Sequence, residues 1–387
     1  MQAIFFQQLD QDLKKHAHGL PKLIVDYQAL QKNIQYIQRQ LSHAAYLKPR
    51  LVVKSLACLD LLKLLSTQLQ TQRFMLFHLP QLLTILEHFS AADVLLGKPM
   101  PARAVCEFYQ QHRQWAEAKI QWLVDTSERL LQYLAIAQQF AIQLKINIEI
   151  DVGLHRGGVQ SNLALIQMLT IIQDHPQYLS FSGLMGYDAH VTKLPKIIKK
   201  VAVAYQQSQT MYLNYKNLIR EQFPDLLQHE LCFNGGGSPS FNLHIQQSVC
   251  NDLSFGSMLL KPSDFDAESL KVLQPALWIA TPVLKVLPST QLPGMPFFNQ
   301  LPQRSKALFI YGGYWMADYV YPTGSHPHAL YGRSSNQELV NVPKNCNIAV
   351  DDYVFLRPTQ SEVIISQFAQ LHCYQNRTFV AWNTFRA

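Results

Sequence analysis

The amino-acid sequence predicts an α/β protein, a TIM-like (β/α)8 barrel followed by a C-terminal, mostly β domain. Two observations lead to this prediction. Between residues 47 and 258, short apolar runs alternate with longer segments in which apolar residues recur every three or four positions, as in amphipathic helices. After about residue 270 the alternation stops, and short β-like segments interrupted by proline and glycine follow. A doubly wound open sheet is the alternative for the first part.

The apolar runs define the expected barrel strands. Strand–helix alternation favours a parallel sheet with crossover helices, and eight is the number of parallel strands that closes such a barrel. The carboxyl ends of the strands then share one face, where barrel enzymes build their sites. We therefore expect residues 20–270 to form one barrel domain. The eight runs are residues 51–54, 74–78, 93–97, 121–125, 146–151, 181–186, 230–236 and 252–257.

The rest of the chain is expected to form the second domain, which comprises residues 271–387. Residues 1–19 precede the first barrel-like unit and are predicted to pack on this β domain. Residues 292–303 are rich in proline and phenylalanine, and they are predicted to form a hairpin loop or a lid.

The composition is that of a globular protein. Of 387 residues, 48% are hydrophobic and 15% are charged, which supplies apolar surface for two cores. No stretch approaches the roughly 20 uncharged apolar residues that a membrane helix needs, and the N-terminus lacks the pattern of a secretory signal. The six cysteines have no paired spacing. We expect them to be reduced in a cytoplasmic protein, with neither disulfides nor a zinc site.

The net charge of +7 at pH 7 raises the question of nucleic-acid binding. Lysine and arginine are spread thinly, and their densest run, residues 193–200, has the pattern of an amphipathic helix with a solvated basic face. We therefore expect no nucleic-acid partner and no membrane partner. A mildly positive field would suit small anionic ligands.

Lys54 closes the first apolar run, at the expected end of a strand. An ammonium ion beside a buried strand is costly, and desolvation favours the neutral amine, which attacks aldehydes. The alternative is an ordinary lysine whose charged end reaches solvent at a strand terminus.

A segment with three successive glycines follows the seventh run. Glycine lets the backbone approach a ligand closely, and backbone amides with serine hydroxyls can surround a phosphate dianion. The loop after the eighth run would form a second wall, as at the usual phosphate site of barrels. A tight loop without a ligand is the alternative. The residues predicted to hold phosphate are Gly236, Gly237, Ser238, Gly256 and Ser257.

Two further loops carry candidate residues. Arg156 lies in the glycine-rich loop after the fifth run, where its planar cation can face a carboxylate, a phenolate or a ring nitrogen. A structural pair between Asp151 and this arginine is the alternative. Tyr187 and His190 follow the sixth run. The tyrosine is a candidate for packing or hydrogen bonding at a ligand, and the histidine for orienting it or a phosphate.

In their order along the chain, these segments resemble the fold-type III enzymes that use pyridoxal phosphate (PLP). The resemblance is to an alanine-racemase-like N-terminal barrel and, more closely, to the D-threonine aldolase and D-serine dehydratase branch. It spans nearly the whole chain and is weaker in the C-terminal domain. The segments that carry it are Pro21–Ile34, Pro49–Lys54, Asp151–Val159, Gly183–His190, Gly235–Ser238 and Gly256–Ser257.

The resemblance implies a role for each candidate. Lys54 would bind PLP as a Schiff base and act as acid and base on one face of the substrate. Arg156 would contact the cofactor ring, and Tyr187 would lie against the pyridine or near the phosphate. The glycines and serines named above would hold that phosphate. The cofactor makes bonds at the α-carbon of an amino acid accessible, while protein groups choose the bond and the face.

The C-terminal domain departs from this branch, which places a His-x-Cys pair there to hold a divalent metal. Gln360 stands where the histidine is expected and Glu362 where the cysteine is. An amide is a poor ligand for a zinc-type ion, so we expect no metal, although Glu338 and Glu362 together would suit a harder cation. Either Gln360 and Glu362 bind the substrate instead, or Glu362 is a proton donor; a polar strand on the β domain is the alternative.

The sequence thus predicts a PLP-dependent lyase for a small, D-configured amino acid, working as a homodimer, with Lys54, Tyr187 and Glu362 as catalytic residues. The first alternative is a racemase with the same lysine and an opposite-face tyrosine from the aromatic segment 311–332. The second is a non-catalytic PLP-binding protein. The large C-terminal domain argues against this second alternative.

Overall fold

The computed structural model of the chain describes residues 2–16, 18–193, 200–227, 230–290, 293–294, 297 and 305–385. Most of the basic run at 193–200 and of the loop at 292–303 therefore lies outside the described residues. The chain divides into two compact units. The β-rich unit comprises Met1–Asn33, Ser55–Leu61 and Leu259–Phe385, and the barrel unit comprises Ile34–Lys54 and Leu62–Met258.

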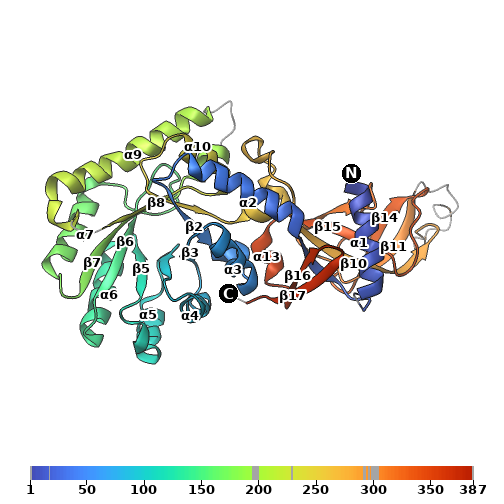
Figure 1. Ribbon diagram of the computed structural model, residues 1–387, viewed down its shortest axis with the longest axis horizontal. Helices are drawn as coiled ribbons and strands as arrows, with labels where there is room; N and C mark the ends of the chain where they lie inside the picture. The colour runs from blue at the N-terminus through green and yellow to red at the C-terminus, as the bar shows by residue number, and fades with distance from the viewer. Residues whose placement is uncertain are drawn as a thin grey trace. The chain divides into compact units, whose positions relative to one another are not determined.

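Eight parallel strands close into a barrel, in which each strand pairs with the next along the chain and the last pairs with the first (Figure 1). Each strand overlaps one of the eight apolar runs, because strands buried on both faces are apolar along their length. The predicted fold class is therefore confirmed. The strands are β2 (Lys48–Val52), β3 (Arg73–Leu76), β4 (Asp93–Leu96), β5 (Lys119–Val124), β6 (Leu144–Glu149), β7 (Leu179–Gly186), β8 (Cys232–Gly235) and β9 (Asp252–Phe255).

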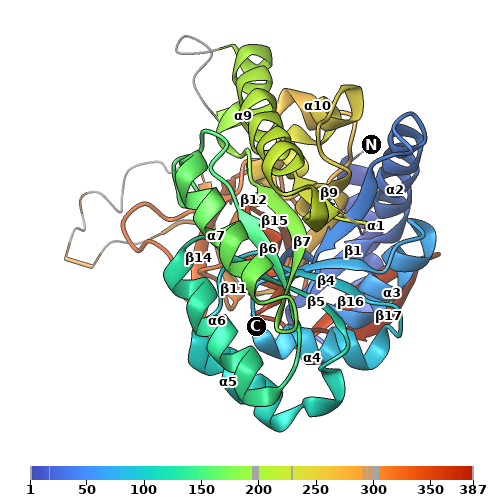
Figure 2. The ribbon, with the colours of Figure 1, turned by 90° about the vertical axis from the view of Figure 1, so that its left-hand side faces the viewer.

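Helices follow the strands, and α5, α6, α7 and α9 lie on the outside of the barrel (Figures 1 and 2). Local signals start two of them, because Thr126 and Ser161 cap α6 and α7 by accepting hydrogen bonds from backbone amides of the first turn. The helices are α2 (Tyr27–Ser42), α3 (Leu59–Gln68), α4 (Leu79–His88), α5 (Ala102–Gln111), α6 (Ser127–Phe140), α7 (Asn162–Asp174), α8 (His190–Lys193), α9 (Val201–Gln222), α10 (Phe241–Gln246) and α11 (Ser257–Leu260).

Charged residues fill one end of the barrel interior. The fully buried Arg50 donates from Nε to Asp252 at 2.7 Å and from Nη2 to Asp93 at 3.0 Å. Asp252 is the first residue of β9 and Asp93 the first of β4. These charges therefore lie toward the amino ends of the strands, away from the face where barrels carry their sites.

The second unit is built on a nine-stranded sheet with the order β13-β14-β11-β10-β1-β16-β17, in which β15 also pairs with β10 and with β12. Strand β1 belongs to this sheet, because it pairs with β10 on one side and β16 on the other. The strands are β1 (Lys22–Asp26), β10 (Leu277–Leu287), β11 (Ser305–Tyr311), β12 (Ala317–Tyr321), β13 (His326–Pro327), β14 (Gln337–Pro343), β15 (Tyr353–Pro358), β16 (Gln370–Gln375) and β17 (Thr378–Asn383).

Helix α1 (Gln2–His16) packs on this sheet through an aromatic cluster. The ring of Phe6 lies 4.8 Å from that of Phe355 and 5.0 Å from that of Trp278, measured between centroids. Leu9 and Leu13 complete the same buried face. A further helix of the unit is α13 (Ser361–Ile365).

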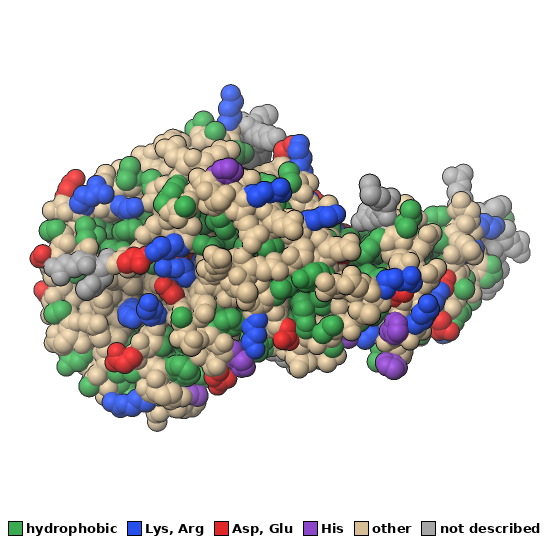
Figure 3. All heavy atoms as spheres, in the orientation of Figure 1, with side chains coloured by type: hydrophobic (Ala, Val, Ile, Leu, Met, Phe, Trp, Pro, Cys, Tyr) green, Lys and Arg blue, Asp and Glu red, His purple; other side chains and the backbone are tan. Residues whose placement is uncertain are grey.

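The surface and helix lengths bear on the expected partners. On the face shown in Figure 3, lysine and arginine side chains are scattered among other types and form no single basic patch. Within the described residues, every helix is too short or too polar to cross a bilayer.

Candidate active site

The sequence-predicted residues of the barrel lie in the loops that follow β2, β6, β7, β8 and β9. Lys54 lies in the short 3-10 helix η1 (Val53–Leu56), just after β2, and is half-buried. Its Nζ atom is 4.6 Å from the centre of the Phe77 ring, which follows β3. A Cβ atom at Gly97 would lie 2.4 Å from Cζ of Phe77. The glycine after β4 therefore leaves room for the ring that packs against the lysine.

The loop after β6 is shaped by Asp151. Its Oδ1 atom accepts hydrogen bonds from the amides of Gly153 and His155 at 2.9 and 3.0 Å, and its Oδ2 atom contacts Nδ1 of His155 at 2.7 Å. Burial would raise the pKa of Asp151, but these hydrogen bonds lower it overall. The aspartate thus holds the loop through His155 and the backbone, while Arg156 points elsewhere.

Arg156 and Tyr187 form one contact. The guanidinium carbon of Arg156 lies 5.1 Å from the centre of the Tyr187 ring, a distance typical of a cation–π interaction. On its other side the tyrosine approaches the glycine turn, since a Cβ atom at Gly237 would lie 3.1 Å from Cε2 of Tyr187. Tyr187 therefore lies between the arginine loop and the glycine turn.

The turn after β8 needs glycine for two reasons at Gly236. Its φ angle is +75°, and a Cβ atom there would lie 2.4 Å from Cδ1 of Leu253. The segment after β9 is joined to this turn by hydrogen bonds. Oγ of Ser238 accepts from the amides of Gly256 at 3.4 Å and Met258 at 3.1 Å. Ser257 lies between them and begins α11. The structure thus brings the five glycines and serines of the predicted phosphate site together.

His190 begins α8 and packs against the arginine loop. A Cβ atom at Gly153 would lie 3.0 Å from its Nε2 atom. Its contact with Gly153 places it beside the loop that carries Arg156.

Glu149 is a residue that the sequence analysis missed. It is the last residue of β6 and lies two positions after Asn147, whose side chain bonds to Gln121 of the neighbouring strand and to the carbonyl of Cys232 inside the barrel. Strand alternation therefore directs Glu149 inward as well. Burial, with the charges of Asp125 and Asp151, raises its pKa to about 7 against the lowering effect of Arg156. This alternation was the signal that could have found it.

The candidates of the C-terminal domain lie in the β-rich unit. Gln360 donates to Asp264 at 2.9 Å, and Glu362 lies half-buried in the first turn of α13. Glu338 is fully buried, and its carboxylate accepts from the amide of Tyr314 at 2.6 Å and from the hydroxyl of Tyr319 at 2.8 Å.

The carboxylate of Glu338 also pairs with Arg333. With these three donors it is already engaged, which disfavours the alternative of a hard cation shared with Glu362. Across the described ranges, no group of three or more His, Cys, Asp or Glu side chains is arranged to hold a metal ion.

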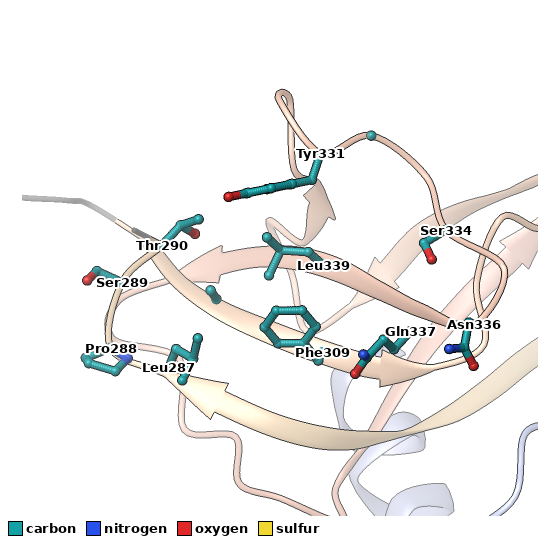
Figure 4. Close-up of a pocket in the computed structure, with 12 residues that line it drawn as sticks. Leu287, Pro288, Ser289, Thr290, Phe309, Tyr331, Ser334, Asn336, Gln337 and Leu339 are labelled. Atoms are coloured by element: carbon teal, nitrogen blue, oxygen red, sulfur yellow. The ribbon is translucent and has the colours of Figure 1, made fainter. Parts of the chain in front are cut away.

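A cavity of about 820 Å³ lies over the face of β10, β11 and β14 in the same unit (Figure 4). Apolar side chains of Leu287, Phe309 and Leu339 form its floor, and Tyr331 points over it. None of the residues predicted from the sequence to bind cofactor or substrate lines this cavity.

Comparison with known proteins agrees with the fold. The structure is similar to D-threonine aldolase from Filomicrobium marinum, with a TM-score of 0.75, 14% identity, and 94% of this chain and 96% of that chain covered. Alanine racemase from Bacillus anthracis gives a TM-score of 0.71 at 14% identity, with 94% and 97% covered. D-threo-3-hydroxyaspartate dehydratase from Delftia sp. HT23 gives 0.73 at 12%, with 95% and 97% covered.

Sequence comparison gives two further matches. A D-threonine aldolase from Arthrobacter sp. is 26% identical over 152 residues, which are 39% of this chain and only 38% of the length of that enzyme. Residues 25–263 match the family described as "Alanine racemase, N-terminal domain". The resemblance predicted from the sequence is thereby confirmed, and because the match covers well over half of the chain, this protein belongs to the alanine racemase N-terminal domain family, a family of PLP-dependent enzymes.

Proposed function

We propose that this protein is a PLP-dependent lyase that acts on a small, D-configured amino acid, with Lys54 as the residue that attaches the cofactor. The observation that carries the proposal is the continuous set of contacts from Arg156 through Tyr187 to the glycine turn, in the barrel whose β2 is followed by Lys54. The D configuration is supported by the names of two relatives, the D-threonine aldolase and the D-threo-3-hydroxyaspartate dehydratase.

The residues at this end of the barrel fit PLP. The Ser238 hydroxyl and the backbone amides around Gly236 and Gly256 are the kind of groups that bind phosphate, and glycine keeps a side chain out of the turn. The amine of Lys54 suits the aldehyde, and Arg156 supplies a fixed positive charge for an oxygen of the ring. When bound, PLP withdraws electrons from the α-carbon of an amino acid, which makes the bonds to this carbon easier to break.

The protein groups would select the bond and the face. Lys54 would move a proton at the α-carbon from the side on which it lies, and the Phe77 ring beside it excludes water from part of its surroundings. Tyr187, held by Arg156 on one side and the turn on the other, would orient the ring. His190 is proposed to support the arginine loop from Gly153. Roles of Gln360 and Glu362 in binding substrate or donating a proton stay predictions.

Racemization is the second candidate. The likeness to alanine racemase supports it, as do two tyrosines of the β-rich unit that remain accessible. Tyr311 is 41% exposed and Tyr314 is 66% exposed, whereas the hydroxyl of Tyr319 is committed to Glu338. An accessible phenol is what an opposite-face acid requires. A homodimer and a cytoplasmic location are further parts of the proposal, and light scattering of the purified protein tests the first of them.

The test begins with the cofactor. Purified protein incubated with PLP and desalted is expected to keep a visible absorbance band, because the amine of Lys54 forms a covalent link to the aldehyde. Lys54→Ala should lose that band, while Lys98→Ala, which removes an exposed lysine after strand β4 of the same barrel, should keep it. A wild-type protein that stays colourless would overturn the proposal.

Product analysis then separates the reactions. Each D- and L-amino acid of a panel is incubated with the PLP-loaded protein, and products are resolved on a chiral column. A dehydratase yields a keto acid and ammonia, an aldolase yields glycine and an aldehyde, and a racemase yields only the enantiomer. Absence of turnover with the whole panel would favour the non-catalytic PLP-binding alternative.

A further inference from the structure

A fully buried polar network lies behind the glycine turn. Asp188, Ser240 and His244 have only 1%, 2% and 1% of their surface exposed. Oδ1 of Asp188 accepts the hydroxyl proton of Ser240 at 2.7 Å, and Oδ2 lies 2.9 Å from Nε2 of His244. These residues are absent from the function derived above, although Asp188 directly follows Tyr187 in the chain.

The network reaches the turn through a directed hydrogen-bond chain. The amide of Gly237 donates to Oγ of Ser240 at 3.2 Å. A hydroxyl has one proton to donate, and the Ser240 proton goes to the carboxylate of Asp188. Ser240 must therefore accept from Gly237, and Asp188 fixes the direction in which the amide at the end of the turn points.

The imidazole of His244 packs against the backbone of the turn at Gly235 and Gly236. A Cβ atom at Gly236 would lie 3.0 Å from its Cδ2 atom, and one at Gly235 would lie 3.4 Å from its Cε1 atom. The ring of Tyr205 packs edge-on against the imidazole at 5.2 Å, and Nδ1 lies 2.8 Å from Oγ of Ser248. The imidazole is therefore held by Asp188, Tyr205 and Ser248, and it also lies against the backbone of the turn.

Both oxygens of the Asp188 carboxylate are engaged, Oδ1 by Ser240 and Oδ2 by His244. Burial would raise the pKa of Asp188, but the charge of His244 and the hydrogen bonds from His244 and Ser240 lower it overall, so the carboxyl stays ionised. The buried carboxylate behind the turn is therefore held by two fixed partners.

We propose that Asp188 is a positioning residue for the cofactor phosphate, acting through Ser240 and His244 on the turn from Gly235 to Gly237. This inference rests on the proposed function, since it requires that the turn hold a phosphate. It extends that function, because it names the groups that set the direction of the turn amide and the charge behind the turn.

The test compares PLP with pyridoxal, which carries the same aldehyde and no phosphate. Asp188→Asn keeps the volume and removes the charge. Because hydrogen bonds to charged groups are among the stronger ones, we expect it to weaken PLP binding about tenfold or more, while pyridoxal binding changes little. The measurement is the dissociation constant of pyridoxal divided by that of PLP, both from absorbance titration, and this ratio should fall. Competition of inorganic phosphate with PLP should weaken in parallel.

Two variants make the result specific. Asp93→Asn also removes a carboxylate from a largely buried ion pair, that with Arg50, but at the amino ends of the strands. It is expected to lower thermal stability and leave the ratio unchanged. Ser240→Ala removes a single hydroxyl and should lower this ratio as Asp188→Asn does, but by a smaller factor. This variant keeps the test available if Asp188→Asn fails to fold.

The outcomes are distinguishable. If wild-type protein prefers PLP over pyridoxal and both Asp188→Asn and Ser240→Ala keep that preference, or if they weaken both ligands equally, the inference is wrong while the proposed function stands. If the wild-type protein takes up neither ligand, the proposed function itself fails.

Discussion

The two ends of the barrel interior use polar residues in opposite ways. At the amino ends of the strands, Arg50 is fully enclosed and bonded to two aspartates that belong to other strands. At the carboxyl ends, the polar residues sit in loops, several of them with glycines beside them, and Arg156 is exposed and contacts a tyrosine ring. The first arrangement satisfies every charge within the fold, and the second leaves groups available to a ligand.

This difference shows how a charged residue that serves stability can be told from one that serves ligand binding. A buried charge whose partners are all residues of barrel strands serves stability. Removing one member of such a pair leaves the other as an unpaired charge in a low-dielectric interior. A charge in a loop that requires glycine serves binding. The glycines leave room for a ligand beside the charge, and their backbone conformation costs local stability. Substitutions at the two ends should therefore change different quantities.

Arg50→Ala should have the largest effect on folding. It leaves Asp252 and Asp93 without their main partner, and breaking a buried pair costs about 3–5 kcal/mol of the free energy of unfolding. Urea unfolding followed by circular dichroism measures this loss. Arg103→Ala, which breaks a pair with Glu107 on the surface helix α5, is the control and should change stability little. Equal losses of stability in the two variants would show that the buried pair of Arg50 contributes no more than a surface pair.

Glu149→Gln should change how stability depends on pH. The carboxyl of Glu149 holds its proton up to a pKa of about 7 in the folded barrel, against an ordinary value of 4.5. Its contribution is therefore fully present below about pH 4.5 and is lost as pH rises through 7, by about 3 kcal/mol at most.

The glutamine stays neutral, so the variant should gain stability relative to the wild type as pH rises from 5 to 8. Urea midpoints at several pH values give the difference between the two proteins, which cancels all groups they share. A constant difference across this range would show that Glu149 ionises normally.

Gly97→Ala should have a smaller effect on stability and a selective one on the site. The added methyl group lies where the Phe77 ring packs beside Lys54, and such overpacking costs about 1–2 kcal/mol. We expect slower covalent attachment of PLP, measured by stopped-flow absorbance, because the ring that packs beside the lysine must move. The double variant Gly97→Ala/Phe77→Leu removes the clash and should recover the rate. No recovery would mean that the ring does not position Lys54.

The sequence was sufficient for the barrel because its signal is local. Each of the eight strands is a short apolar run with a helical pattern after it, and residues at strand ends such as Lys54 and Gly236 could be placed on one face from topology alone. The grouping of Ser238 with Gly256 followed in the same way, since consecutive barrel strands are neighbours.

The missed features depend on partners that are far apart in the chain. Arg50 lies directly before the apolar run 51–54 and was given no role, and its partner Asp252 is 202 positions away. Asp188 meets Ser240 and His244 across 52 and 56 positions. No periodicity marks such pairs, because a single polar residue beside a strand has the same appearance whether its partner is buried or is water.

The position of β1 has a consequence for biosynthesis. Leu23, Ile24 and Val25 are fully buried between a strand that begins at Leu277 and one that begins at Gln370. Strand β1 must therefore wait for β10 before its first edge can pair and for β16, nearly the last strand, before its second edge can pair, while the barrel strands can already close. During that interval β1 has an open edge, and open strand edges promote association between chains. Nascent chains truncated before Gln370 should accordingly be the ones that engage chaperones.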